Sequence, residues 1–111
     1  MKKIAAIGEL LIDFVPQEKG CALSDVVHFE RVAGGAPANV VTAVSRLGGN
    51  GVMVSQVGCD AFGTHIIREL EKSGVDTRYV FRTRQANTGL AFVSLAADGN
   101  REFSFFRNPS A

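Results

Sequence analysis

The chain has 111 residues, the size of one domain, and its 46% hydrophobic and 21% charged residues are typical of a globular protein. Twelve Lys and Arg against eleven Asp and Glu leave a formal net charge of +1, which favours neither a nucleic acid nor a membrane as partner. Cys21 and Cys59 form no CxxC pair, so the sequence predicts no disulfide framework or zinc cluster and favours a reducing cytoplasm. Glu9 and Asp13 interrupt the first apolar run too early for a secretory signal, and no segment approaches a membrane span.

Strands are predicted in both halves of the chain. The unbroken apolar run at residues 4–8 predicts a strand covered on both faces, as in a parallel sheet flanked by helices. Residues 10–14 continue in extended conformation, and residues 26–32 alternate like a short exposed strand. Residues 52–57 and 75–82 are two further predicted strands.

Two helices are predicted between these strands. Pro37 suits the first position of a helix, and Gly48 suits a left-handed helix end. The expected apolar face of this first helix consists of Val40, Ala43, Val44 and Leu47. Asp60 is placed to cap a second helix, which Gly74 closes. The expected buried stripe of the second helix consists of Phe62, Ile66, Ile67 and Leu70.

The last part of the chain predicts a hairpin. Residues 88–96 and 101–106 are strands, and residues 97–100 form a turn with Asp98-Gly99 at its centre. The order strand, helix, strand, helix, strand, followed by this hairpin, predicts an α/β fold with an added antiparallel element. Because residues 108–111 come just after an aromatic strand, we expect the chain to be part of a longer domain.

Several common catalytic signatures are absent from the sequence. There is no GxxxxGK[ST] phosphate loop, and no GxGxxG follows the first strand. His28 and His65 have no nearby thiol for a metal site, and no local pattern supports a serine or cysteine nucleophile.

A glycine pair that leads into a helix is the best candidate for a binding site. Gly34 and Gly35 would let a ligand approach the backbone closely, where the free N–H groups of the helix start can hold its oxygen atoms. Asn39 offers a donor and an acceptor, which suits a pair of vicinal hydroxyls. Asp13 is expected at the carboxyl end of the first strand, where it could accept charge-assisted hydrogen bonds from such hydroxyls.

Each of these residues also has a purely structural interpretation. The glycine pair can be a simple turn, Asn39 a solvated helix residue, and Asp13 a cap or surface residue. Arg107 can be the solvated end of a strand. The aromatic residues of the last strand are more often part of a core or an interface than ligand contacts; they are Phe103, Phe105 and Phe106.

The segment 34–63, GGAPANVVTAVSRLGGNGVMVSQVGCDAFG, closely resembles the N-terminal signature of the PfkB (ribokinase-like) carbohydrate kinases. The opening IGELLIDF and the final FSFFRNPSA look most like the fructokinase branch. The resemblance covers the whole segment and implies the N-terminal part of a ribokinase-like fold. That fold is a three-layer α/β/α (Rossmann-like) sheet with a protruding antiparallel β lid, here at approximately residues 14–32 and 88–107.

The resemblance implies an ATP-dependent sugar kinase that uses Mg²⁺ and transfers the γ-phosphoryl group of ATP to a primary hydroxyl. In such kinases the residues matching Asp13, Gly34, Gly35 and Asn39 hold the hydroxyls of the sugar, and Arg107 would contact it from the lid. The resemblance also implies a homodimer formed through the lid strands. It places no catalytic, nucleotide-binding or metal-binding residue in this segment.

The family's C-terminal motif D-T-x-G-A-G-D, which carries the catalytic aspartate, is missing from these 111 residues. The resemblance thus implies that the C-terminal ATP-binding and catalytic part is absent, and we expect the segment alone to be inactive. Alternatives within the family are kinases of ribose, 2-keto-3-deoxygluconate or a nucleoside. A non-catalytic sugar-binding module is an alternative of another class, whereas a plain dinucleotide-binding domain lacks its glycine fingerprint.

Overall fold

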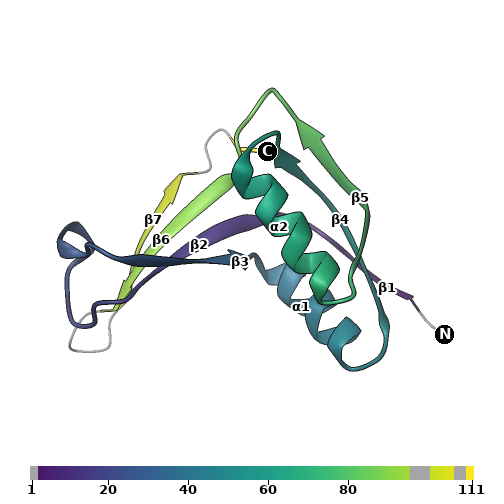
Figure 1. The fold of residues 1–111 in the computed structure, drawn as a ribbon, viewed down its shortest axis with the longest axis horizontal. Coiled ribbons are helices and arrows are strands. Elements are labelled where there is room, and N and C mark those ends of the chain that lie inside the picture. Colours follow the sequence, from purple (N-terminus) through teal and green to yellow (C-terminus); the bar gives the residue numbers. More distant parts are fainter. Residues whose placement is uncertain (1–2, 96–100, 107–109) are drawn as a thin grey trace.

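A computed structural model of the chain describes residues 3–95, 101–106 and 110–111 (Figure 1). The helices and strands follow in the order β1 (Lys3–Ile7), β2 (Leu11–Pro16), the short 3-10 helix η1 (Leu23–Asp25), β3 (Phe29–Gly34), α1 (Ala36–Arg46), β4 (Asn50–Gly58), α2 (Ala61–Lys72), β5 (Asp76–Thr83), β6 (Gly89–Leu95) and β7 (Arg101–Phe106). They form two sheets, one with strand order β1-β4-β5 and the other with strand order β3-β2-β6-β7. The predicted α/β fold is confirmed.

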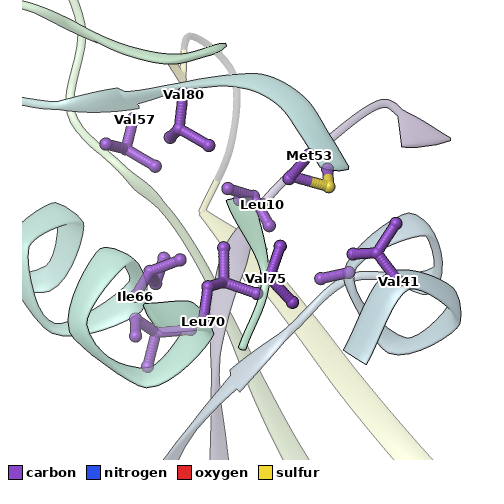
Figure 2. Packing of buried hydrophobic residues seen from close by; sticks show 10 residues of the cluster. Leu10, Val41, Met53, Val57, Ile66, Leu70, Val75 and Val80 are labelled. Carbon is purple, nitrogen blue, oxygen red and sulfur yellow. The ribbon is translucent and has the colours of Figure 1, made fainter. Parts of the chain in front are cut away.

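The first sheet is parallel throughout, and both long helices pack against it. Such a sheet needs a helical crossover between its strands, and α1 and α2 supply these connections. Figure 2 shows apolar side chains of α1, α2 and the strands converging in one core. The buried members of this core are Leu10, Ile12, Ala38, Val41, Met53, Val57, Ile66, Leu70, Val75 and Val80.

The second sheet is mixed and extends away from the helices (Figure 1). Strand β2 pairs antiparallel with β3 and parallel with β6, and β6 pairs antiparallel with β7. The two strands of the predicted hairpin are therefore present as β6 and β7. The turn predicted between them at residues 97–100 lies outside the described residues.

An aromatic cluster, Phe14, Phe29, Phe62, Phe92 and Phe106, joins the second sheet to α2. The Phe14 and Phe92 rings stack with centroids 4.6 Å apart, and Phe62 of α2 packs edge-on against Phe14 at 5.8 Å. Offset-stacked and edge-to-face pairs are favourable geometries for aromatic rings, so these contacts fix the second sheet against the helix.

Helix α2 forms as predicted. The Asp60 side chain accepts a hydrogen bond from the Gly63 N–H at 2.8 Å, which satisfies one of the free donors of the helix start. Ile66 and Leu70 of the predicted stripe are buried, and its other members, Phe62 and Ile67, pack against the core. Gly74 has a φ of +84°, the left-handed conformation expected after a helix.

The predicted buried face of α1 is wrong. Val40 is 53% exposed and Leu47 89% exposed, whereas Ala38 and Val41 are buried. Because Val40 and Val41 are adjacent, either of two faces of the helix could be buried. Close packing on β4 decides between them, and Val41 is the buried residue. A Cβ on Gly51 of β4 would lie 2.5 Å from the Val41 carbonyl oxygen, so this face of the helix sits almost directly on the strand.

Strand β1 is present, but the prediction that both of its faces are covered is wrong. Ile4 is 46% exposed and Ile7 78% exposed. Among the described residues β1 pairs only with β4 and forms an edge of its sheet, with α1 packed against it. The apolar run was therefore a correct signal for a strand and a misleading one for burial.

Candidate functional site

Asp13 lies inside β2 of the second sheet, flanked by Val32 of β3 and Ala91 of β6. We predicted Asp13 at the carboxyl end of the first strand, and this placement is wrong. Strand β1 ends at Ile7, and residues 8–10 then carry the chain across to the second sheet. The carboxylate thus belongs to the second sheet and not to the parallel sheet.

Asp13 lines a hollow of about 350 Å³, a volume within the range of small-molecule binding sites. Strands β2, β6 and β7 and the segment after β2 contribute to it. Its lining residues are Asp13, Val15, Pro16, Glu18, Lys19, Val93, Arg101 and Phe103. Apolar walls with a few charged groups suit a small ligand that has both hydroxyls and C–H surface.

The Asp13 carboxylate is available to a ligand. Burial raises the pKa of Asp13 above its ordinary value of 3.8, because the surrounding protein solvates the charge less well than water does. Within the described part of the chain no hydrogen bond to this carboxylate is formed. A desolvated carboxylate with open acceptor positions in a hollow is a typical feature of a functional site.

The second carboxylate of the hollow, Glu18, is already engaged. His28 Nδ1 lies 2.6 Å from Glu18 Oε1, and the His28 backbone N–H donates to both carboxylate oxygens at 3.2 Å. The hydrogen bond with the His28 side chain is the largest cause that lowers the pKa of Glu18. Glu18 therefore anchors the segment between β2 and β3, and Asp13 is the carboxylate left to bind.

Gly34 and Gly35 bring the end of β3 close to this carboxylate. A Cβ on Gly34 would lie 2.9 Å from Asp13 Cγ and would overlap Asp13 Oδ2. Gly35 precedes α1 with a φ of +112°, and a Cβ there would lie 2.5 Å from the Glu9 carbonyl oxygen. The structure thus places Asp13 and Gly34 together, with Gly35 at the start of the helix.

The other two predicted site residues stand apart from this group. Asn39 lies in the first turn of α1, where its N–H donates to the Gly35 carbonyl oxygen at 3.1 Å. It borders a different hollow, of about 260 Å³, between α1 and α2, so its contact with a ligand stays a prediction. Arg107 lies outside the described residues.

Four charged or aromatic residues of the Asp13 hollow are not among the predicted site residues: Glu18, Lys19, Arg101 and Phe103. Two of them had a signal in the sequence. Arg101 and Phe103 are two positions apart in a strand, so they must share a face. The pairing of β7 with β6, which decides that this is the Asp13 face, could not be read from the strand itself.

Comparison with known proteins identifies the family. The whole chain, residues 1–111, matches the family described as pfkB family carbohydrate kinase. The chain belongs to this family. Fructokinase-1 of Zea mays is 50% identical to it over 108 residues, which are 97% of this chain and 33% of the maize protein. The chain thus spans about a third of the length of the curated relatives it matches.

Solved structures of sugar kinases share the fold. Fructokinase from Xylella fastidiosa matches with a TM-score of 0.87 and 44% identity, covering 98% of this chain and 33% of that protein. An uncharacterised sugar kinase from Pyrococcus horikoshii, solved in complex with ATP, matches with a TM-score of 0.89 and 44% identity. This second match covers 96% of this chain and 34% of the kinase.

Proposed function

We propose that the full-length protein is an ATP-dependent sugar kinase of the fructokinase type, and that residues 1–111 form its sugar-binding side. The observation that carries the proposal is the partly buried Asp13 carboxylate, with open acceptor positions, in a hollow of suitable size and with Gly34 against it. Membership of the pfkB family and the fructokinase names of the relatives support the choice of reaction.

In this proposal Asp13 orients the sugar. Its two oxygens accept hydrogen bonds from neighbouring hydroxyls, and such bonds to a charged acceptor are about twice as strong as neutral ones. Gly34 leaves room for the sugar beside the carboxylate, and Asn39 supplies a further contact. The second sheet, with strands β2, β3, β6 and β7, acts as the lid, and its closure excludes water that would compete as phosphoryl acceptor.

We place the sites for the nucleotide and Mg²⁺ outside these 111 residues. The described residues contain no group of three His, Cys, Asp or Glu side chains that could hold a metal ion. The sequence also lacks the D-T-x-G-A-G-D motif. We therefore place the base, the nucleotide and the metal in the remaining two thirds of the protein, and we expect residues 1–111 alone to form no sugar phosphate. The Xylella fastidiosa fructokinase solved with bound ATP supports ATP as the phosphoryl donor.

Two further parts of the proposal concern assembly and location. We place a homodimer contact on the lid strands, where apolar side chains such as Val32 of β3 and Phe105 of β7 are exposed. We also propose a cytoplasmic location, where ATP is supplied. In the described part of the chain, no helix is long and apolar enough to cross a membrane.

The proposal is tested by incubating the full-length protein with ATP, Mg²⁺ and one sugar at a time. Fructose, ribose, 2-keto-3-deoxygluconate and a nucleoside form the panel. We expect sugar phosphate with fructose at the highest kcat/KM. Binding of sugar without any product would favour the non-catalytic module, and a preference for another substrate would reassign the protein within the family.

The two glycines of the site should respond differently to the same substitution. Gly34→Ala pushes against the movable end of the Asp13 side chain, so we expect KM for the sugar to rise about tenfold with little loss of stability. Gly35→Ala is strained at a φ of +112° and meets the Glu9 backbone, so it should lower the free energy of unfolding by about 1–3 kcal/mol. Urea unfolding and steady-state kinetics of both variants give the comparison, and equal effects of the two substitutions on KM and stability would contradict it.

A further inference from the structure

Phe103 shares a face of the second sheet with Asp13. Asp13 of β2 is in register with Ala91 of β6, and Ala91 is in register with Phe105 of β7. Val93, two residues beyond Ala91, is opposite Phe103. Paired residues and residues two apart project to the same side of a sheet, so this face carries Asp13 at one place and the Phe103 ring two strands away.

Phe105 shares this face with Phe103, whereas the other four aromatic residues of the sheet belong to the opposite face. Phe14, Phe29, Phe92 and Phe106 contact one another there, with ring centroids 4.6–6.4 Å apart. Packing inside the aromatic cluster accounts for all four. Phe103 takes no part in that cluster, so its position requires a different explanation.

The Phe103 ring has a fixed orientation and remains half exposed to solvent. It stacks on Phe105 with centroids 5.8 Å apart and an angle of 5° between the planes, which fixes its orientation. Phe103 is nevertheless 48% exposed and lines the same hollow as Asp13. A rigid aromatic surface beside a hollow offers contact area at a small cost in side-chain entropy.

The hollow therefore has two chemically different sides. The Asp13 carboxylate stands on one side and the Phe103 ring on the other, with the small side chain of Val93 between their strands. A sugar also has two kinds of surface, namely hydroxyls and patches of C–H groups. The negatively polarised face of an aromatic ring attracts the C–H groups, while a carboxylate accepts from the hydroxyls.

We infer that Phe103 is a specificity-determining residue, whose ring packs against the C–H surface of the sugar while Asp13 holds its hydroxyls. This inference rests on the proposed sugar-binding function. Asp13, Ala91 and Phe105 form one row across the strands, and Phe103 lies two residues away from that row along β7. It therefore contacts the end of the sugar remote from Asp13, which a hexose reaches more fully than a pentose. Phe103 thus favours fructose over ribose.

The first test compares two substitutions on the same strand of the full-length protein. Phe103→Leu keeps an apolar side chain but removes the ring, so kcat/KM for fructose should fall about tenfold, mainly through KM. The value for ribose should change less than about threefold. Phe106→Leu is the matched control, because Phe106 projects to the opposite face, and it should leave the fructose-to-ribose ratio unchanged. An unaltered ratio in folded Phe103→Leu would overturn the inference.

A second test measures binding directly, without ATP. These 111 residues contain no tryptophan, so Phe103→Trp introduces a new fluorophore at the proposed contact. Fructose should change the emission of Phe103→Trp, measured against the unsubstituted protein, and should not change that of Phe106→Trp. A Phe103→Trp signal that saturating fructose leaves unaltered would overturn the inference, even if Phe103→Leu fails to fold.

The two tests separate the two claims. If the unsubstituted protein binds fructose but forms no sugar phosphate, the kinase proposal fails, and the fluorescence result still decides the role of Phe103. The present inference alone fails if the protein is active, Phe103→Leu keeps the fructose-to-ribose ratio, and fructose leaves the emission of Phe103→Trp unchanged. Absence of any sugar binding would overturn both.

Discussion

Asp13→Ala in the full-length protein should lower kcat/KM for its sugar by about 10²–10⁴-fold. The reason is the loss of two hydrogen bonds between sugar hydroxyls and a charged acceptor, each worth about 1.5–3 kcal/mol and together roughly 3–6 kcal/mol. The carboxylate has open acceptor positions in the hollow, whereas the other carboxylate there, Glu18, is engaged by His28. Steady-state kinetics over a range of sugar concentrations measure the effect.

A matched control and a stability measurement make this result specific. Asp25→Ala removes an exposed carboxylate in η1, outside the hollow, and should leave kcat/KM unchanged.

Because burial raises the pKa of Asp13, the folded state disfavours the ionised form, and this lowers stability as pH rises through the folded pKa. Asp13→Asn should therefore retain or raise the melting temperature at pH 7 while it impairs sugar use. Full activity of Asp13→Asn, or a lower melting temperature of this variant at pH 7, would contradict this role.

The parts of the fold that depend on local chemistry were predictable from sequence. Helix α2 illustrates this, because its capping residue Asp60, its stripe of apolar residues and its closing Gly74 all act within a few turns. The strands were likewise placed correctly by apolar runs and turn residues. In each case the interactions that decide the structure are made between residues close in sequence.

The parts that depend on distant contacts were not predictable in the same way. The apolar residues of α1 allowed two faces, and the choice was made by close approach to Gly51 of β4. The exposure of β1 follows from which strands are present beside it, and an apolar run contains no information about its neighbours. Assignment of Asp13 to the second sheet also depends on pairing between strands far apart in the chain.

The candidate site shows the same division. Asp13, Gly34 and Gly35 were found from their residue types and the family resemblance, and the structure groups Asp13 with Gly34. The division of the β7 aromatics between two faces was not found. Phe103 and Phe105 share one face and Phe106 lies on the other, and only the register with β6 shows which face carries Asp13.

Asp60 connects the two sheets, and its removal should have the largest effect on stability. Its carboxylate accepts hydrogen bonds from the Gly63 N–H at 2.8 Å, the Thr88 hydroxyl at 2.7 Å and the Thr88 N–H at 2.9 Å. The Thr88 hydroxyl in turn accepts from the Gly58 N–H at 2.9 Å. These bonds join the end of β4, the start of α2 and the approach to β6, which is where the second sheet meets the first.

Asp60→Ala should therefore lower the free energy of unfolding by roughly 3–7 kcal/mol. The variant loses a helix cap, at about 1 kcal/mol, and leaves the Thr88 donors without a partner, at about 1–3 kcal/mol each. Thr88 is 3% exposed, so water cannot readily replace the lost acceptor. Urea unfolding of the full-length protein measures the total, and hydrogen exchange at residues 86–90 should show faster opening at this junction.

Acid titration distinguishes this role from a general loss of charge. Burial of Asp60 tends to raise its pKa, but hydrogen bonds from Thr88 and Gly63 and the charge of Arg82 outweigh this and lower the pKa below its ordinary value of 3.8. The carboxylate thus stabilises the fold above the unfolded-state pKa, and this contribution is lost as pH falls through the folded pKa. Asp60→Asn should remove that part of the acid sensitivity.

Asp76 is the matched control. Its hydrogen bonds with Arg78 lower its pKa to about 2, but the pair lies at the solvent-accessible surface. Asp76→Ala should therefore barely move the urea midpoint. Equal destabilisation by Asp60→Ala and Asp76→Ala would show that surface charge, and not the junction of the two sheets, accounts for the effect.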